Sequence, residues 1–360
     1  MKILFIAPLP PPIHGQSLAA KVFLDYISLY HEVDVVDTCK KSHKDGINNL
    51  GRVFEVLKIL VSVFKKQQKV DLIYFHVSES LGGNLKDLMI YLICLGKLNR
   101  TYIHLHGGSL KRLLFDKWAL VKLINRYFIS KLAGCIVLGP SHVQVFEGMI
   151  ASERIKIAPN FAENLIFKDI EAVSNNFNTG NPIRVLYMSN LIPGKGYEYL
   201  LSAYLNSNEQ IKKSIVIDFA GGFESDLDKQ RFLDQIKPFD ALQYYGVVSG
   251  VRKQTLFHQA QVFCLPTSYF EGQPISILEA YASGCVVVTT LKGGIVDIFE
   301  VGKNGFSIEE KSEDSIIKCL ELLIQQRDQL HQIALTNRTI AEQNYKIDTY
   351  NKTLRSQLGL

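Results

Sequence analysis

The sequence has few cysteines, and none of them has the spacing of a metal ligand or a redox pair. No CxxC or related pattern occurs, and several cysteines lie inside apolar runs such as residues 262–266. We therefore expect reduced, buried thiols of a cytosolic protein and no disulfide framework. The six cysteines are Cys39, Cys94, Cys135, Cys264, Cys285 and Cys319.

Long hydrophobic runs are also missing. The best candidate, residues 88–96, is about half of the 18 to 20 residues that a membrane-spanning helix needs. The N-terminal segment MKILFIAPLPPP is interrupted by prolines and has no small-residue cleavage site, so we expect a first strand there and no signal peptide. No glycine cluster spells GxGxxG after a strand, which argues against a dinucleotide oxidoreductase.

The sequence does have the composition of a packed globular protein, with 47% hydrophobic and 21% charged residues in 360. A chain of this length usually forms two domains. Its charge is uneven, because residues 1–170 carry a net charge of +8 and the rest −3. We therefore expect any large anionic partner to meet the first half of the chain.

Short β-branched or aromatic runs alternate with longer amphipathic segments, which predicts repeated βαβ units and parallel sheets. The pattern restarts after a polar stretch at 172–183, which we interpret as a linker between domains. The predicted domains are residues 1–172 and 173–360, and helices near the C-terminus are expected to return to the first domain. The predicted strands are 2–7, 33–37, 71–76, 101–105, 134–138, 184–189, 214–220, 243–245, 261–265, 285–289 and 306–308.

The most informative motif, FEGQPISILEA at residues 270–280, directly follows a predicted strand. Pro274 suits the first position of a helix, which would leave Gly272 and Gln273 just outside it. A helix start presents unpaired N–H groups and a partial positive charge to an anionic diphosphate. Glu271 and Glu279 would flank this point, where carboxylates accept hydrogen bonds from sugar hydroxyls. Taken alone, both glutamates are equally well explained as surface residues.

The Glu-x7-Glu motif, followed by AlaSerGly at 282–284, an apolar strand and GlyGly at 293–294, resembles the signature of retaining glycosyltransferase family 4. The resemblance implies an α/β GT-B fold, in which two Rossmann-like, doubly wound domains face each other across a donor-binding cleft, with a C-terminal helical segment. It also implies that Gly272, Gln273, Pro274, Ile275 and Glu279 bind a nucleotide sugar, and that Glu271 is catalytic.

Two further segments match the family in order along the chain. Lys195 lies between two glycines after a predicted strand, where its charge can oppose the diphosphate. The family usually has an arginine where this chain has Asn190, which is predicted to bind the donor without a charge. Lys195 would then supply more of the positive charge that opposes the diphosphate. His106 matches the histidine beside the donor sugar. The alternatives, a solvated turn lysine and a polar turn histidine, remain open.

The glycine-rich loops of the family are matched less closely. Gly15 lets the backbone approach phosphate, but Gln16 occupies the position of a second glycine. Gly222 fits the family, and Val247 lies in the loop where such enzymes bind the base. All four residues are predicted to bind the donor.

We predict neither a metal nor another cofactor. His104 and His106 have an HxH spacing, but no clustered third ligand is evident in the sequence. Asp226 and Asp228 have the form of a metal-binding carboxylate pair, although their charged surroundings favour an exposed helix start.

The resemblance implies a retaining hexosyltransferase that moves a sugar from a UDP-sugar to a saccharide acceptor in bacterial O-antigen or capsule biosynthesis. We expect a cytoplasmic protein, because no membrane span is predicted. Two alternatives are a nucleotide-sugar epimerase or hydrolase of the same fold, and a non-catalytic nucleotide-sugar-binding regulator. The acceptor is expected to dock on the first domain.

Residues 109–131 are basic and amphipathic, with Trp118, Tyr127 and Phe128 interleaved among lysines and arginines. Such a segment suits an anionic membrane surface and a polyprenyl-diphosphate-linked acceptor on the inner face of the cell membrane. An ordinary helix whose aromatic residues pack in the core explains the pattern equally well. No nucleic-acid-binding motif accompanies the charge.

Overall fold

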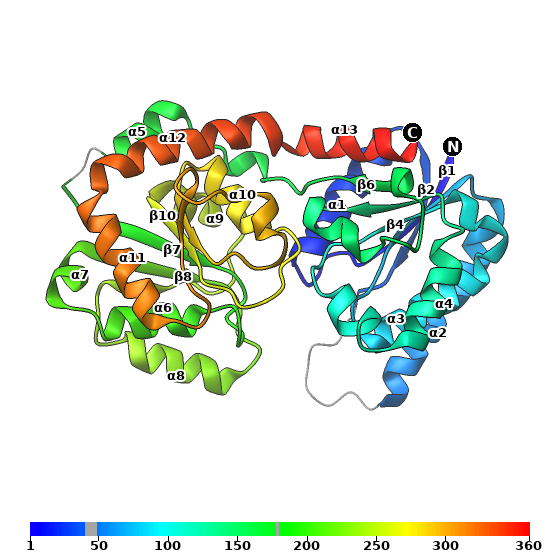
Figure 1. Cartoon of the computed structure of the whole chain (residues 1–360), viewed down its shortest axis with the longest axis horizontal. Coiled ribbons are helices and arrows are strands. Elements are labelled where there is room, and N and C mark those ends of the chain that lie inside the picture. The colour runs from blue at the N-terminus through cyan, green and yellow to red at the C-terminus, as the bar shows by residue number, and fades with distance from the viewer. Residues whose placement is uncertain (40–48, 178–179) are drawn as a thin grey trace. The chain divides into compact units, whose positions relative to one another are not determined.

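The computed structural model describes residues 1–39, 49–177 and 180–360, and the side chains from residue 51 onward in the second helix. The chain forms two compact units, each with its own sheet and core (Figure 1). The first unit comprises Met1–Asn160, Glu271–Gln273 and Tyr350–Leu360, and the second comprises Phe161–Phe270 and Pro274–Thr349.

The first unit is built on a six-stranded parallel sheet with the order β2-β1-β3-β4-β5-β6. Its central strands are buried on both faces, as the nearly continuous apolar sequence of β1 requires. The strands are β1 (Lys2–Ala7), β2 (Glu32–Asp37), β3 (Leu72–His76), β4 (Thr101–His104), β5 (Gly134–Val137) and β6 (Ile155–Ile157).

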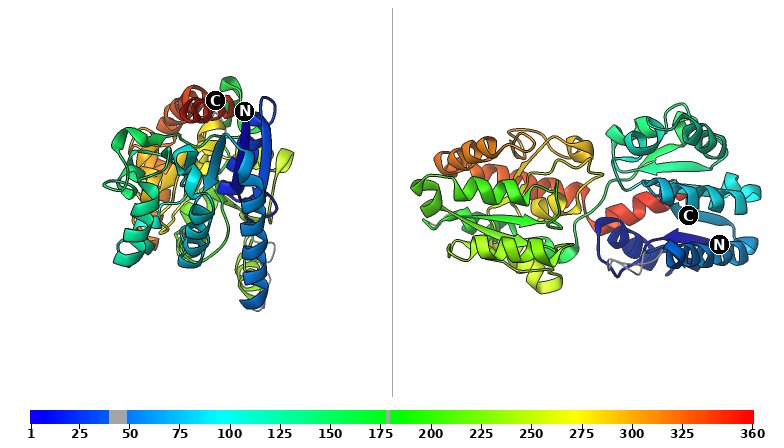
Figure 2. Two further views of the ribbon diagram at one scale, coloured as in Figure 1. Left: turned by 90° about the vertical axis from the view of Figure 1, so that its right-hand side faces the viewer. Right: turned by 90° about the horizontal axis from the view of Figure 1, so that it is seen from below.

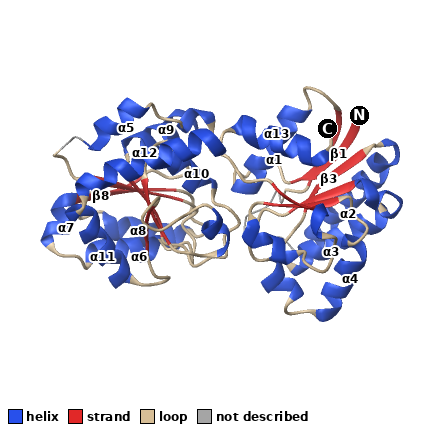
Figure 3. Cartoon of the chain, turned by 45° about the horizontal axis from the view of Figure 1, so that its top comes forward, coloured by secondary structure: helices blue, strands red, loops and turns tan. Residues whose placement is uncertain are grey.

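Helices cover both faces of this sheet (Figure 3). Tyr350 of the last helix donates a hydrogen bond of 3.4 Å to the Ala19 carbonyl and packs its ring on Phe23. The helices that contribute to the unit are α1 (Gly15–Ile27), α2 (Asn49–Lys66), α3 (Leu81–Ile93), α4 (Ala119–Ile129) and most of α13 (Ile347–Leu358).

The second unit has a six-stranded parallel sheet with the order β12-β11-β10-β7-β8-β9. The first strand of the unit, β7, has β8 and then β9 on one side, and β10, β11 and β12 follow on its other side. The strand order therefore reverses between β7 and β10. The strands are β7 (Ile183–Met188), β8 (Ile215–Ala220), β9 (Leu242–Tyr244), β10 (Val262–Leu265), β11 (Val286–Thr289) and β12 (Gly305–Ser307).

Helices also lie on both faces of the second sheet (Figures 2 and 3). They are α5 (Ile170–Phe177), α6 (Tyr197–Leu205), α7 (Glu209–Ser214), α8 (Asp226–Ile236), α9 (Gly250–Gln259), α10 (Ile275–Ala282), α11 (Glu313–Gln325) and α12 (Arg327–Asn344).

The structure confirms the predicted pair of parallel α/β sheets, and it differs from the sequence analysis at three places. The edge strand β6 was missed, since a lysine interrupts its short apolar run. The segment 109–131 is not one helix, because a π-helical turn at Lys111–Phe115 precedes α4. The stretch 172–183 begins inside α5, where Val173 is buried, and its residues 178–179 lie outside the described part.

The domain boundary also differs from the predicted division at 172–173. The second unit begins at Phe161, before α5. The polar stretch that was interpreted as a linker therefore lies inside the second unit, and its first part packs there as α5. The prediction relied on the low average hydrophobicity of this stretch. One buried residue, Val173, is enough to attach α5 to the core.

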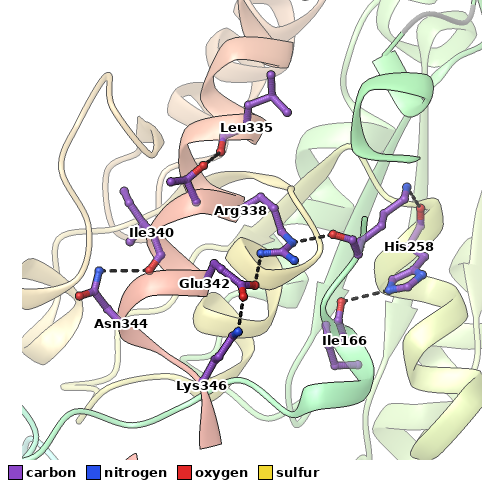
Figure 4. A network of polar contacts seen from close by, with 10 residues as sticks. Ile166, His258, Leu335, Arg338, Ile340, Glu342, Asn344 and Lys346 are labelled. Carbon is purple, nitrogen blue, oxygen red and sulfur yellow. Dashed lines mark hydrogen bonds and ion pairs between the residues drawn. The ribbon is translucent and has the colours of Figure 1, made fainter. Parts of the chain in front are cut away.

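Polar contacts attach α12 to the rest of the second unit (Figure 4). Arg338 donates through Nε to the Lys168 carbonyl at 2.6 Å and pairs with Glu342 at 2.7 Å. Lys168 in turn donates to the His258 carbonyl at 2.7 Å, and the His258 ring contacts the Ile166 carbonyl at 3.0 Å. The helix is thus tied to the segment that enters the unit.

Asn337 fixes the same helix to the end of the sheet. Its side chain is fully buried and donates to the carbonyls of Cys285 and Asn304 at 2.8 and 2.9 Å. It also accepts a bond of 2.8 Å from the Asn304 amide. The strands β11 and β12 that follow these two residues are therefore held in register with α12.

We predict that Asn337→Ala lowers the free energy of unfolding of the second unit by about 3 kcal/mol, because it leaves several buried polar groups without partners. Urea unfolding followed by circular dichroism measures the change. The matched control is Asn344→Ala on the same helix, where the side chain is exposed and the expected change is below about 0.5 kcal/mol. Equal effects of the two substitutions would contradict the assignment.

Candidate active site

The turn Gly194–Lys195–Gly196 lies at the carboxyl end of β7, directly before α6. Both glycines have a positive φ, of 89° and 84°, which side chains other than glycine rarely adopt. A Cβ on Gly196 would lie 2.0 Å from the Pro266 carbonyl oxygen, so this turn packs its backbone against the loop after β10. Ser268 N–H donates to the Gly194 carbonyl at 2.8 Å and closes the contact. Only glycine on both sides lets Lys195 occupy this position.

This contact is made at the point where the strand order of the second sheet reverses. In open α/β sheets, ligands bind outside the carboxyl ends of the strands at such a point. The Lys195 ammonium lies 5.2 Å from the centre of the Tyr269 ring, and Tyr187 donates to the Lys195 carbonyl at 3.4 Å. The lysine therefore lies at the edge where an anionic ligand is expected.

Three predicted donor-binding residues come from successive loops on the other side of the same edge. Asn190 is exposed after β7, and its carbonyl accepts a bond of 3.2 Å from Tyr187. The Gly222 carbonyl accepts from Leu191 N–H at 2.8 Å, and a Cβ on Gly222 would lie 3.2 Å from the Val247 side chain. Val247 is 74% exposed. The structure thus brings Asn190, Gly222 and Val247 close together.

The helix α10 begins one residue later than predicted. Pro274 is its extended N-cap, with φ −62° and ψ 116°, and Ile275 is the first helical residue. Gly272 and Gln273 lie outside the helix, as predicted. The start of α10 follows the loop that Gly196 contacts, so Lys195 and this helix start come from neighbouring strands.

Glu279 is not at the surface of α10. Its side chain is buried, and its Oε1 lies 2.5 Å from the ammonium of Lys253 on α9. The same ammonium lies 2.7 Å from Glu163. Burial is the main cause that raises the pKa of Glu279, to about 7, and Lys253 acts in the opposite direction. Sequence analysis missed Lys253 and Glu163, because neither belongs to a recognisable motif.

In the first unit, Gly15 and Gln16 open α1 at the carboxyl end of β1. His14 is the N-cap, and its Nδ1 accepts a bond of 3.2 Å from Ser17 N–H. The unit's strand order reverses between β1 and β3, so this helix start also lies at a ligand-binding edge. Gly15 has no positive φ, so its backbone conformation does not itself require glycine.

His106 follows β4 and packs with two other histidines. The ring centres of His104 and His76 lie 4.0 and 4.4 Å from that of His106, and the ring planes are tilted by 37° and 35°. The hydroxyl of Tyr74 lies 2.5 Å from His104 Nδ1 and 3.1 Å from His76 Nε2. Both ring nitrogens of His106 are buried and lack a hydrogen-bond partner among the described residues.

His76 is the third potential ligand that the sequence did not reveal beside His104 and His106. One nitrogen from each of the three rings lies within 4.8 Å of the others. The rings pack partly face to face, whereas nitrogen ligands at about 2.0 to 2.1 Å from a zinc ion would point at a common centre. The arrangement therefore favours packed neutral imidazoles. Burial lowers the pKa of all three, that of His106 to about 3.

The segment Glu271–Gln273 is held within the first unit. A Cβ on Gly272 would lie 1.9 Å from the His106 carbonyl oxygen, which explains why glycine is needed. Gln273 is buried, and its Oε1 accepts a bond of 2.5 Å from Asn160 N–H. Asn160 returns a bond of 2.8 Å to the Gln273 carbonyl. Glu271 directly precedes the glycine that lies against the His106 carbonyl.

Asp226 and Asp228 form the first turn of α8, which Ser225 caps. Asp228 contacts Arg231 at 3.6 Å on the exposed side of this helix. The interpretation of this acidic pair as a helix start is therefore confirmed.

The two Rossmann-like units together make the GT-B fold. Residues 168–339, which form most of the second unit, match the family model described as glycosyl transferases group 1. The suspected relationship to glycosyltransferases is confirmed for that segment, which contains Lys195, Glu271 and Glu279.

Two curated relatives support the same relationship. An uncharacterized glycosyltransferase of Methanocaldococcus jannaschii, MJ1607, is 30% identical over 37% of this chain and 33% of its own length. The lipopolysaccharide 1,2-N-acetylglucosaminetransferase of Salmonella typhimurium is 24% identical over 48% of this chain and 47% of its own length. This chain therefore spans less than half of these relatives.

The likeness to solved structures extends over the whole chain. The crystal structure of Anabaena Alr3699/HepE in complex with UDP and glucose aligns with a TM-score of 0.72 and 17% identity, covering 100% of this chain and 99% of that one. At this level of identity the likeness shows the fold. Within the described residues, no helix has both the length and the apolar character to cross a membrane.

We predict that the three buried histidines make the first unit sensitive to mild acid. Their folded-state pKa values lie below the ordinary value of 6.5, so the unfolded chain takes up protons first as the pH falls below about 6.5. Their stabilising contribution is complete above that pH and is lost as the pH falls further. By pH 5.5 the loss should be about 1.4 kcal/mol for each histidine.

Fluorescence of Trp118, the single tryptophan, reports on the first unit during urea unfolding at pH 7.5 and 5.5. His104→Asn should reduce the difference between the two pH values by about 1.4 kcal/mol. His331→Asn in the second unit is the control and should leave it unchanged. A pH difference that His104→Asn does not reduce would refute the prediction.

Proposed function

We propose that this chain is a retaining hexosyltransferase that moves a sugar from a UDP-sugar to a saccharide acceptor. The observation that carries the proposal is the Gly194–Lys195–Gly196 turn at the edge where the sheet order reverses, inside the segment that matches the glycosyl transferases. The UDP bound to Anabaena HepE, a protein of the same fold, supports the choice of nucleotide.

In this proposal Lys195 stabilises the diphosphate as it leaves. The N–H groups at the start of α10, near Gly272, Gln273 and Pro274, add positive dipoles that need no reorganisation during the reaction. These groups come from the chain itself, so we propose that the transfer needs no metal and no cofactor. Gly15, Gln16 and Ile275 complete the set of backbone contacts to the donor.

The sugar is held by Glu271 and His106. An ionised carboxylate accepts strong hydrogen bonds from sugar hydroxyls, and a neutral imidazole both donates and accepts one. Because the pKa of His106 is lowered to about 3, it acts as a neutral hydrogen-bonding group at pH 7. Asn190, Gly222 and Val247 bind the nucleotide, with Val247 beside the base and Glu279 at the ribose.

Retention of configuration requires a route without net inversion at the anomeric carbon. A two-step route uses a carboxylate close beneath that carbon, and the family motif offers none. We therefore propose a same-face transfer in which the departing diphosphate helps to deprotonate the acceptor hydroxyl. Product analysis with donor alone and with acceptor distinguishes this transferase from an epimerase or hydrolase, and from a regulator without turnover.

We predict that Lys195→Ala and Glu271→Ala each lower turnover by about a hundredfold or more, which is the usual cost of losing one group that stabilises developing charge. A thermal-shift screen over nucleotide sugars selects the donor, because selective binding raises the melting temperature. Turnover of that donor is then measured for each variant.

The controls are Lys213→Ala and Glu309→Ala, which remove exposed charges from the same half of the chain. All four variants should melt within about 2 °C of the wild type, since surface changes cost little stability. Wild-type turnover by either site variant would remove that residue from the site. A wild type that no nucleotide sugar stabilises would contradict the proposed function.

We also propose that the first unit docks on an anionic membrane, where the acceptor is lipid-linked. Half of the exposed large hydrophobic side chains of the described residues lie between residues 53 and 127. They come from α2, α3 and α4 and from residues next to the ends of α3 and α4, and these helices lie side by side (Figures 1 and 2). They are Val53, Phe54, Leu57, Val61, Phe64, Leu81, Leu85, Met89, Leu92, Leu95, Trp118, Leu120, Leu123, Ile124 and Tyr127.

The segment 109–131 has both buried and exposed aromatic side chains. Phe128 packs in the core, whereas Trp118 and Tyr127 are 52% and 54% exposed. The net basic charge of this segment complements anionic headgroups, and its exposed apolar side chains suit the lipid interface. We place this surface on the cytoplasmic face of the membrane that carries the acceptor for O-antigen or capsule assembly, and the lipopolysaccharide enzyme among its relatives supports this choice.

We predict that the protein sediments with vesicles that contain phosphatidylglycerol and not with phosphatidylcholine alone, and that salt weakens the binding. Leu123→Glu should reduce the partition coefficient about tenfold, because it removes an inserted side chain and adds a repelled charge. Leu227→Glu on α8, equally exposed, is the control. Equal binding of the two variants would refute the docking surface, and concentration-dependent self-association without vesicle binding would point to a protein partner.

A further inference from the structure

Lys253 lies between two carboxylates in the second unit. It projects from α9, and its ammonium is 2.5 Å from Glu279 Oε1 and 2.7 Å from Glu163 Oε1. The side chain of Lys253 is 13% exposed and that of Glu279 only 2%. A charged side chain is rarely buried to this extent unless it is paired, so the cluster has a specific arrangement.

The cluster leaves Glu279 with unused hydrogen-bonding capacity. Its carboxylate accepts from Lys253 and from the backbone N–H of Glu163. An ionised carboxylate offers about four acceptor positions, so these two bonds leave acceptor positions unused. Two vicinal hydroxyls of a ribose are donors for such positions.

Without Lys253 this carboxylate would not be ready for such a ligand. A buried carboxylate that has no cation nearby takes up a proton, because the charged form is poorly solvated. The neutral acid accepts fewer hydrogen bonds and presents its own proton to the ligand. An arginine or lysine at position 253 is thus needed for Glu279 to remain a fixed anion.

We propose that Lys253 is a positioning residue that holds Glu279 as an oriented anion for the ribose hydroxyls of the nucleotide donor. The inference rests on the proposed function, in which Glu279 meets the ribose. It adds a residue that the family motif does not contain. It also makes recognition of the ribose depend on a residue that itself contacts only protein groups.

The charges that face Glu279 give the proposal a pH signature. They are Lys253 from α9 and Glu163 from the segment before α5, and they act on its pKa in opposite directions. Removal of Lys253 should raise the pKa of Glu279 above about 7, and removal of the Glu163 charge should lower it. Ribose preference should follow the ionised form of Glu279.

The experiment measures dissociation constants by calorimetry for UDP, ADP and GDP and for their 2′,3′-dideoxy forms. The ratio of the two constants reports only on the ribose hydroxyls, since phosphate and base are common to each pair. For the wild type at pH 8 we expect the dideoxy form to bind at least about tenfold more weakly. Lys253→Met should bring this ratio close to one at pH 7, with partial recovery at pH 9, and Lys253→Arg should preserve it.

The control is Lys303→Met, which removes an exposed ion pair with Glu300 in the same unit and should keep the wild-type ratio. Glu163→Gln is the second variant, needed if Lys253→Met fails to fold. It should shift the midpoint of the ribose preference to lower pH, because it removes a charge that opposes ionisation of Glu279.

The outcomes separate the proposal from the function on which it rests. An unchanged ratio in Lys253→Met, or an unmoved midpoint in Glu163→Gln, would overturn the role of Lys253 while nucleotide binding stands. A wild-type ratio near one would show that Glu279 does not read the ribose. If no nucleoside diphosphate binds the wild type, the proposed function fails and the inference with it.

Discussion

The close approach between the turn at Gly194–Gly196 and the loop after β10 is the constraint on which the rest of the second unit's site depends. Neither glycine can carry a side chain there, because both have a positive φ and a Cβ on Gly196 would overlap the Pro266 carbonyl. The contact joins the two strands between which the sheet order reverses. It therefore brings a cation and a helix start to the edge where α/β sheets bind anions.

The protein buries ionisable groups in two different ways, one in each unit. The histidines at 76, 104 and 106 are buried without a counter-charge, so burial holds them neutral. Glu279 is buried with Lys253, whose ammonium opposes the effect of burial on the pKa of Glu279. Breaking such a pair is costly because the remaining charge has no solvent. The first arrangement suits hydrogen bonding to a sugar, and the second suits an anion that must stay ionised.

The sequence was sufficient to predict the two sheets and the placement of Lys195, since β-branched runs and a glycine-flanked lysine are local signals. It failed for β6, whose short apolar run is interrupted by a lysine, and for α5, where a polar stretch contains one buried valine. It could not reveal that Lys253 meets Glu279 or that His76 meets His106. Such pairs depend on which strands become neighbours, and no spacing along the chain records that.

The segment 271–273 is held in place by contacts of Gly272 and Gln273. Gln273 was expected to face the donor, yet its side chain accepts from Asn160 N–H and Asn160 bonds back to its carbonyl. Gly272 lies against the His106 carbonyl, where any side chain would collide. The segment is therefore fixed by Gly272 and Gln273, the two residues that follow Glu271. These contacts set the backbone position of Glu271 directly before them, and the sequence motif alone does not record them, because Asn160 and His106 lie far from it along the chain.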